Sequence, residues 1–325
     1  MKKAQPSTEY FETNHLRQYL LHTRSNRPDA PVMLLVHGGP GGPDSNTAYQ
    51  YQIWWQDLFH LISWDQRGCG KTLAANGQPP AYPVTVPELL CDMHGIIEHI
   101  KTSYGVDRIF VFGHSWGTVL GTLYTLEHPE NVAAYIGAGQ FCNFFRNEIA
   151  AYAKTKEVVE AAGSRRDLAK LESILPYPDR PMDPDSVVVK KKMPVLKRLQ
   201  ARYNIAGKVT TELIRIYLRS PAFRISDFSM FSKKAAGYSK DLLRFVFDFE
   251  ILDCGVKYEA PVFYILGDRD YQTAAPVAME YFESIEAPLK QLFLLPDAGH
   301  GMMYDQPEAF AQALNEIITL VGWNR

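Results

Sequence analysis

The sequence predicts an α/β fold, in which a mostly parallel central sheet is flanked by helices and carries an inserted, mainly helical cap. Two observations lead to this prediction. Short apolar runs that end in turn residues alternate with stretches of helical periodicity, as buried parallel strands and their crossover helices do. The alternation stops near residue 142 and returns near residue 260, a span far longer than an ordinary connection between core elements.

The first part of the core is predicted over residues 1–141. Apolar and polar residues alternate weakly over residues 8–22, which predicts an opening hairpin. A helix is predicted after Thr85, because Thr85 and Glu88 have the spacing of a capping box and apolar residues follow at helical intervals. The other elements predicted here are strands at residues 32–36, 59–64, 108–112 and 132–136, and a helix at residues 116–127.

Residues 142–257 form the predicted cap, and residues 258–325 form the second part of the core. The cap contains helical patterns at residues 147–162 and 210–218. The second part of the core is predicted to contain strands at residues 262–266 and 291–295, a helix at residues 276–285 and a last helix from Pro307. The chain is therefore predicted to be a core in two pieces with a cap between them.

The composition of the 325-residue chain restricts the classes of function. Its 46% of hydrophobic residues suffice for a large core, and its net charge of −2 creates no field that would recruit nucleic acid or an anionic membrane. No signal peptide is recognised, and the four cysteines have neither zinc-site nor disulfide spacing, so we expect a cytoplasmic protein with reduced thiols. The expected partner is a small molecule or a short peptide, and the composition leaves the oligomeric state open.

The motif that carries the chemistry lies at residues 113–117, which read Gly-His-Ser-Trp-Gly between a predicted strand and a predicted helix. In a G-x-S-x-G turn at such a junction, small flanking residues allow a strained serine whose hydroxyl projects into a pocket. The amino end of the following helix adds amide donors and a positive dipole end. The motif therefore predicts Ser115 as a nucleophile.

A serine nucleophile needs a histidine base and a carboxylate that orients it, in the chain order Ser, acid, His. The acid is expected after a late core strand, where the sequence offers Asp268 and Asp270. We favour Asp270, at the third position after Gly267, and keep Asp268 as the alternative. The predicted base is His300, which lies in a Gly-rich loop directly after the strand at residues 291–295.

Hydrolysis also requires donors for the oxyanion that develops on the substrate. One is the backbone amide of Trp116, which directly follows the predicted nucleophile. The second is expected from the Gly-rich loop at residues 37–42, most favourably from Gly39, because glycines allow close approach of the backbone to a substrate.

Three motifs give the chain a resemblance to the α/β-hydrolase fold, and within it to the proline iminopeptidase (prolyl aminopeptidase) family of serine peptidases. They are His-Gly-Gly-Pro-Gly-Gly at residues 37–42, Asp-Gln-Arg-Gly-Cys-Gly at residues 65–70, and Gly-His-Ser-Trp-Gly at residues 113–117. The resemblance covers roughly residues 8–140 and 258–320. It implies a helical cap whose acidic residues hold the free amino terminus of the substrate. The cap glutamates are Glu148, Glu157, Glu160, Glu172, Glu212 and Glu250, and none of them lies in a recognisable motif.

These observations predict a serine hydrolase that forms an acyl-enzyme and needs neither metal nor organic cofactor. An aminopeptidase acting on short peptides or amino-acid amides is favoured, and a carboxylesterase or other small-molecule hydrolase is the alternative. A more distant alternative is a related ligand-binding protein without turnover. A phosphate-binding loop ending at residues 68–72 is excluded, because that motif needs a glycine where this chain has Asp65. Asp65 and Arg67 are instead predicted to brace the active-site loop.

Overall fold

A computed structural model of the chain describes residues 6–77, 82–205, 216, 218–220, 222 and 233–323, without the side chains of residues 233–239. Most of the predicted helix at residues 210–218 lies outside these ranges, and so does Glu212.

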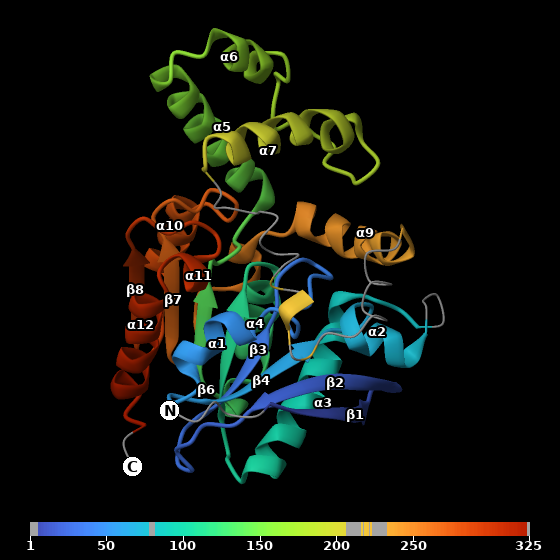
Figure 1. Ribbon diagram of the computed structural model, residues 1–325, viewed down its shortest axis with the longest axis vertical. Coiled ribbons are helices and arrows are strands. Elements are labelled where there is room, and N and C mark those ends of the chain that lie inside the picture. Colours follow the sequence, from blue (N-terminus) through green and yellow to red (C-terminus); the bar gives the residue numbers. More distant parts are fainter. Residues whose placement is uncertain are drawn as a thin grey trace.

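An eight-stranded sheet forms the centre of the described chain (Figure 1), in the order β1-β2-β4-β3-β5-β6-β7-β8. Strand β2 pairs in antiparallel fashion with β1 and β4, whereas all pairs from β4 to β8 are parallel. The predicted mostly parallel sheet is therefore confirmed. The strands are β1 (Ser7–Thr13), β2 (Leu16–Thr23), β3 (Val32–Val36), β4 (His60–Asp65), β5 (Ile109–His114), β6 (Val132–Ala138), β7 (Val262–Gly267) and β8 (Lys290–Leu295).

Helices cover both faces of the sheet, as the continuous apolar strands require. In β3, Val32 and Leu34 belong to the apolar core that includes residues of α3, α4 and α10, whereas Met33 and Leu35 belong to the core on the other face, with residues of α1, α11 and α12. The core helices are α1 (Tyr49–Trp55), α2 (Gly70–Asn76), α3 (Val86–Tyr104), α4 (Trp116–Glu127), a short 3-10 helix (Pro129–Asn131), α10 (Ala275–Ser284), α11 (Met302–Asp305) and α12 (Pro307–Leu320).

Between β6 and β7 the described chain is helical, and α5, α6 and α7 extend away from the sheet (Figure 1). These three helices share a small apolar core of their own that includes Ala151, Val159, Leu171 and Leu196. The helices of this segment are α5 (Phe144–Ala161), α6 (Arg165–Glu172), a short π-helix (Val188–Lys192), α7 (Met193–Arg202), α9 (Lys233–Asp248) and a 3-10 helix (Ile251–Cys254). No helix in the described ranges has the length and apolar character needed to cross a membrane.

The predicted capping box at the start of α3 is wrong. Thr85 is the N-cap residue, but its side chain forms no cap hydrogen bond. The Glu88 carboxylate instead accepts a hydrogen bond of 2.8 Å from Asn14 and lies 3.0 Å from a guanidinium nitrogen of Arg67. Partners from distant parts of the chain thus replace the local contact that the spacing suggested.

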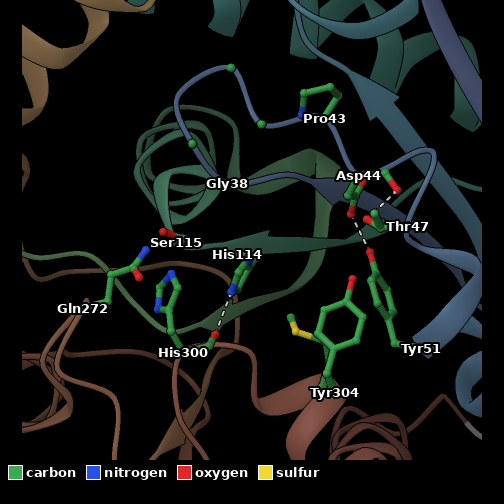
Figure 2. A pocket seen from close by; sticks show the side chains of 14 residues that line it. Gly38, Pro43, Asp44, Thr47, Tyr51, His114, Ser115, Gln272, His300 and Tyr304 are labelled. Atoms are coloured by element: carbon green, nitrogen blue, oxygen red, sulfur yellow. Dashed lines mark hydrogen bonds between the residues drawn. The ribbon is translucent and has the colours of Figure 1, made fainter. Parts of the chain in front are cut away.

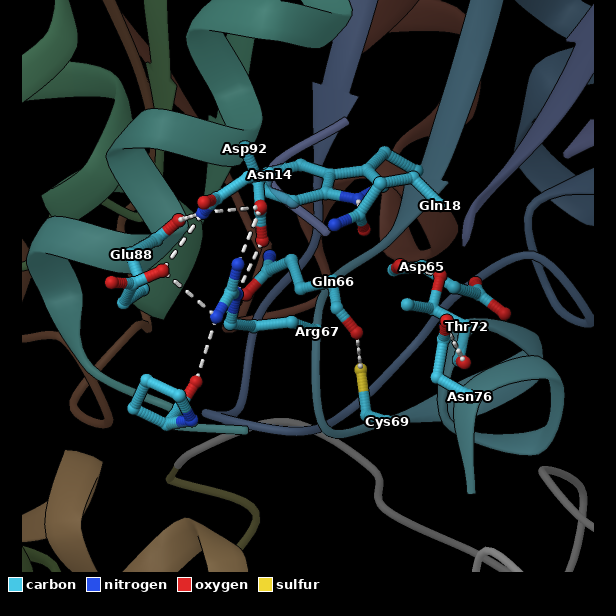
Figure 3. Close-up of polar contacts among 12 residues, drawn as sticks. Asn14, Gln18, Asp65, Gln66, Arg67, Cys69, Thr72, Asn76, Glu88 and Asp92 are labelled. Atoms are coloured by element: carbon cyan, nitrogen blue, oxygen red, sulfur yellow. Dashed lines mark hydrogen bonds and ion pairs between the residues drawn. The ribbon is translucent and has the colours of Figure 1, made fainter. Parts of the chain in front are cut away.

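Arg67 forms a buried ion pair that ties the turn after β4 to α3 (Figure 3). Its Nε and Nη2 donate to the two carboxylate oxygens of Asp92 at 2.6 and 2.7 Å, and both side chains are almost fully shielded from solvent. Burial alone raises the pKa of Asp92, and the guanidinium opposes this effect.

We expect Arg67→Met to lower the free energy of unfolding by about 3–5 kcal/mol, because the buried Asp92 carboxylate loses its counter-charge. Chemical denaturation followed by circular dichroism measures this change. The matched control is Arg27→Met, since Arg27 forms a solvent-exposed pair with Asp29 and such pairs contribute little. Equal stabilities for the two variants would contradict the assignment.

Candidate active site

Ser115 lies at a sharp turn between β5 and α4. Its backbone has a φ of 54°, in the left-handed region that non-glycine residues rarely adopt. The turn is held by a hydrogen bond of 3.1 Å from the Ser115 amide to the carbonyl of Ala138. A Cβ atom at Gly117 would lie 1.9 Å from the carbonyl oxygen of Val36, so only glycine fits beside β3. The motif glycine therefore allows the close helix–strand packing that presents Ser115.

His300 is joined to Asp270 and not to Asp268. The Nδ1 atom of His300, in the loop after β8, lies 2.9 Å from Oδ2 of the fully buried Asp270. Asp268 is exposed and accepts a hydrogen bond of 3.3 Å from the amide of Ala298. Of the two candidate acids, the structure brings Asp270 to the imidazole.

The surroundings of Asp270 keep its carboxylate ionised although it is buried. Burial on its own raises the pKa, but the interactions with His300, Gln272 and Thr273 outweigh it, so the pKa lies below its ordinary value. The Thr273 hydroxyl lies 2.9 Å from Asp270 Oδ2 and 3.2 Å from His300 Nδ1. An ionised acid at Nδ1 keeps the proton on that atom and leaves Nε2 free to act as a base.

The Gly-rich loop after β3 reaches the serine. A Cβ atom at Gly38 would lie 3.2 Å from the Cβ atom of Ser115, and Gly39 has a φ of 128°, which other residues rarely adopt. His37 fixes the start of the loop, because its Nδ1 donates to the carbonyl of Gly38 at 2.8 Å. Burial lowers the pKa of His37 to about 4, so the imidazole is neutral and its Nε2 accepts a hydrogen bond of 3.2 Å from the amide of Gln66.

Gln66 connects this loop to the helix that follows the serine. Its side-chain Nε2 donates to the carbonyl of His37 at 2.9 Å, and its side-chain Oε1 accepts from the indole nitrogen of Trp116 at 3.1 Å. Trp116 is the first residue of α4, a position whose backbone amide has no partner within its own helix.

Of the two residues predicted to brace the active-site loop, Asp65 accepts a hydrogen bond of 3.1 Å from Ser45, just after the loop, whereas Arg67 pairs with α3 instead. Gln66, between them, makes the contacts to His37. Sequence reasoning missed Gln66, although it lies inside the motif at residues 65–70.

His114 supports the loop that carries His300. Its Nε2 donates to the carbonyl of His300 at 3.0 Å, and the two rings are 4.9 Å apart (Figure 2). Burial lowers the pKa of His114 to about 4, with a smaller contribution from the nearby His300. This imidazole is therefore neutral near pH 7. Its position inside the serine motif is the signal that could have identified it.

A cavity of about 430 Å³ brings these groups together. Figure 2 shows Ser115 facing the ring of His300 within it. No hydrogen bond between the Ser115 hydroxyl and His300 occurs in the described part of the chain, and such contacts often tighten only when substrate is bound. The cavity is lined by Gly38, Gly39, Gly41, Gly42, Pro43, Asp44, Thr47, Tyr51, His114, Ser115, Gln272, His300, Met303 and Tyr304.

None of the five described cap glutamates lines this cavity. Glu148, on α5, is buried and accepts hydrogen bonds from Tyr177 and, at 2.7 Å, from Lys197. Glu250 accepts from the side chain of Asn143 at 2.9 Å. The other three, Glu157, Glu160 and Glu172, lie on the exposed surface of α5 and α6. The amine-binding role implied for cap glutamates therefore has no support in the described residues.

Comparison with known proteins places the chain in a broad group of enzymes. A family model described as the alpha/beta hydrolase family matches residues 33–313, which is well over half of the chain. A Bacillus subtilis (strain 168) protein named "Probable aminopeptidase YbaC" is 21% identical over 285 residues, covering 88% of each chain. The proline iminopeptidase of Neisseria gonorrhoeae is 29% identical over 132 residues, which span only 41% of this chain and 39% of that protein.

The likeness extends to solved structures. The crystal structure of the proline iminopeptidase of Mycobacterium smegmatis matches with a TM-score of 0.72 and 18% sequence identity. The match covers 97% of this chain and 98% of that chain. At this level of identity the structural likeness shows the α/β-hydrolase fold, which the sequence motifs had predicted.

Proposed function

This chain belongs to the alpha/beta hydrolase family, and from that premise we propose that it is a serine hydrolase that works through an acyl-enzyme. One observation carries the proposal. His300 is joined to the ionised Asp270 at 2.9 Å and shares a cavity with Ser115, which lies on a strained turn at the amino end of α4. A candidate nucleophile and a candidate base therefore share one cavity, and a buried acid contacts the base.

In the first half of the reaction, the Ser115 oxygen attacks the carbonyl carbon of the substrate while His300 Nε2 takes the hydroxyl proton. The bond to the leaving group then breaks, and His300 returns the proton to the departing amine or alcohol. Asp270 stabilises the imidazolium that exists between these steps. In the second half, His300 takes a proton from water while the water oxygen attacks the carbonyl carbon of the acyl-enzyme. The bond to the Ser115 oxygen then breaks, His300 returns the proton to that oxygen, and the carboxylic acid product leaves.

The negative oxygen formed in each half-reaction requires hydrogen-bond donors. We assign this role to the backbone amides of Gly39 and Trp116. Gly39 lines the cavity beside the serine, and Trp116 begins the helix that Ser115 caps. The contacts of Gln66 to His37 and Trp116 hold both donor segments in one arrangement, and such fixed donors stabilise a developing charge without reorganising.

The proposed substrate is a short peptide or an amino-acid amide that is cleaved after its first residue. The two relatives and the solved structure described above carry aminopeptidase or proline iminopeptidase names, and this supports the assignment. The alternative is a carboxylesterase, whose substrates carry no free amine and so require no acidic group to bind one.

A substrate panel separates these two activities. L-proline 4-nitroanilide and L-alanine 4-nitroanilide are compared with their N-acetylated forms and with 4-nitrophenyl butyrate. We expect the free-amine anilides to be hydrolysed, and the N-acetylated forms to lose at least tenfold in kcat/KM, because blocking removes the charge on the amine. Turnover of the ester alone would replace the aminopeptidase assignment with the esterase. No turnover of any of these substrates would contradict both.

A further inference from the structure

Strand β6 lies between the two strands that present the nucleophile and the acid. In the sheet it is flanked by β5, which leads into the turn of Ser115, and by β7, whose following loop carries Asp270. The three strands are parallel, so their carboxyl ends meet at one edge of the sheet (Figure 1). The end of β6, at Ala138 and Gly139, therefore lies between the two groups.

The backbone at the end of β6 is fixed on both sides. The carbonyl of Ala138 accepts the hydrogen bond of 3.1 Å from the Ser115 amide. The amide of the next residue, Gly139, donates to the carbonyl of Ile265 in β7 at 3.1 Å. One short segment thus contacts the turn of the nucleophile and the strand that leads to the acid.

Gly139 also packs directly on the acid–base pair. A Cβ atom at this position would lie 3.2 Å from Oδ2 of Asp270 and 3.4 Å from Nδ1 of His300, the two atoms of the acid–base contact. It would lie 3.1 Å from the hydroxyl oxygen of Thr273 as well. The φ of Gly139 is 57°, which residues with a side chain rarely adopt. The bare backbone of Gly139 therefore covers one side of the contact between His300 and Asp270.

Thr273 adds a second contact to the same two atoms. Its hydroxyl donates to Asp270 Oδ2 at 2.9 Å, and the hydroxyl oxygen lies 3.2 Å from His300 Nδ1. Its backbone amide donates to the other carboxylate oxygen at 3.1 Å. Thr273 and Asp270 are both almost fully buried. A hydrogen bond enclosed in this way is protected from competing water and is held in one geometry.

We infer that Gly139 and Thr273 are positioning residues that hold His300 at Asp270, while the adjacent Ala138 holds the turn of Ser115. The end of β6 thereby sets the spacing between the base and the nucleophile. Neither Gly139 nor Thr273 is among the residues that line the cavity, so both act through His300 and not on the substrate. This inference rests on the proposed function of the site.

Gly139→Ala tests the contact with the acid–base pair. We expect kcat on the best substrate of the panel to fall by roughly 10- to 100-fold with KM changed little, because the added Cβ atom displaces the imidazole or the carboxylate. The matched control is Gly105→Ala. Gly105 has a similar φ of 65°, but a Cβ atom there would meet nothing within 4 Å, so we expect the wild-type kcat. Equal kcat values for the two variants would overturn the inference.

Two substitutions of Thr273 test the enclosure without changing the backbone. Thr273→Val keeps the shape of the side chain but removes the hydroxyl, and we expect kcat to fall roughly tenfold because a hydrogen bond to a charged group is lost. Thr273→Ser keeps the hydroxyl and is expected to retain kcat within about threefold of the wild type. Equal losses for the two variants, or no loss for Thr273→Val, would overturn the inference. Thermal melting confirms that each variant is folded.

A spectroscopic measurement separates this inference from the proposed function. Long-range ¹H–¹⁵N NMR of protein with ¹⁵N-labelled histidine reports the tautomer of His300, whose signals are assigned by their loss in His300→Ala. At a pH where the imidazole is neutral, we expect the Nδ1–H tautomer in the wild type and in Gly105→Ala, and a mixture of tautomers in Gly139→Ala. No substrate is needed, so failure of turnover in the substrate panel leaves this result intact. An unchanged tautomer in Gly139→Ala would overturn the inference alone, whereas a wild-type ring without the Nδ1–H tautomer would overturn the acid assignment as well.

Discussion

Replacing Ser115 with alanine is expected to lower kcat by about 10⁴- to 10⁶-fold on every substrate that the protein hydrolyses. The reason is chemical, since alanine has no oxygen that can form the acyl-enzyme. Only the contribution of substrate binding and of the oxyanion donors remains. Steady-state kinetics on the best substrate of the panel measure the loss.

The same substitution is expected to leave the fold intact. The backbone contacts of the turn come from the Ser115 amide and carbonyl, and the variant keeps both. The matched control is Ser173→Ala at the exposed end of α6, which removes a hydroxyl without touching the cavity. A Ser115→Ala protein that melts normally and still hydrolyses substrate at the wild-type rate would remove the nucleophile assignment.

Asp270→Asn is expected to lower kcat by about 10⁴-fold. An asparagine cannot stabilise the imidazolium of His300, and its amide group can hold the imidazole in the wrong tautomer. Thr273 adds to this loss of kcat. In the wild-type protein its hydroxyl donates to Asp270 and lies 3.2 Å from His300 Nδ1, so the substitution disturbs both contacts. The loss is expected in kcat, with KM changed little.

Asp268→Asn is the control for the acid. Asp268 lies two residues before Asp270 and is exposed. Its carboxylate accepts a hydrogen bond from the amide of Ala298 and does not contact His300. We expect its substitution to change kcat less than about threefold, as for other exposed positions outside a site. If Asp268→Asn were the more damaging of the two, the acid would have to be reassigned.

The core of the fold was largely predictable from the sequence because its signals are local. Residues 32–36 and 116–127 coincide with β3 and α4, since both are apolar segments with sharp turn residues at their ends. The hairpin at residues 8–22 was also correct, and Asn14 and His15 form its two-residue turn with positive φ values. The failed capping box at Thr85 shows the limit of such signals, because the partners of Glu88 come from other segments of the chain.

The candidate catalytic residues could be selected because each follows a core strand within a short motif. The residues that support them could not. Gln66 and His114 act through contacts with residues 29 to 186 positions away, and nothing in the local pattern specifies those contacts.

The helical segment between β6 and β7 was the least predictable part of the described chain. The importance of a cap glutamate depends on which way its helix faces, and this is decided by packing between helices. Glu148 illustrates the point, since it is buried and its carboxylate contacts Lys197 and Tyr177 within the same helical segment. From the sequence alone, Glu148 and the exposed Glu157 were equally good candidates for binding the substrate amine.

Covalent labelling tests the central claim, nucleophilic catalysis by Ser115, most directly. Diisopropyl fluorophosphate is added to the wild-type protein, and intact and peptide mass spectrometry locate the adduct formed when an enzyme oxygen displaces fluoride from phosphorus. The account predicts one adduct, on the peptide that contains Ser115, with none in Ser115→Ala and much slower formation in Asp270→Asn. An adduct on another residue, or no adduct on a protein that hydrolyses substrate, would contradict the account.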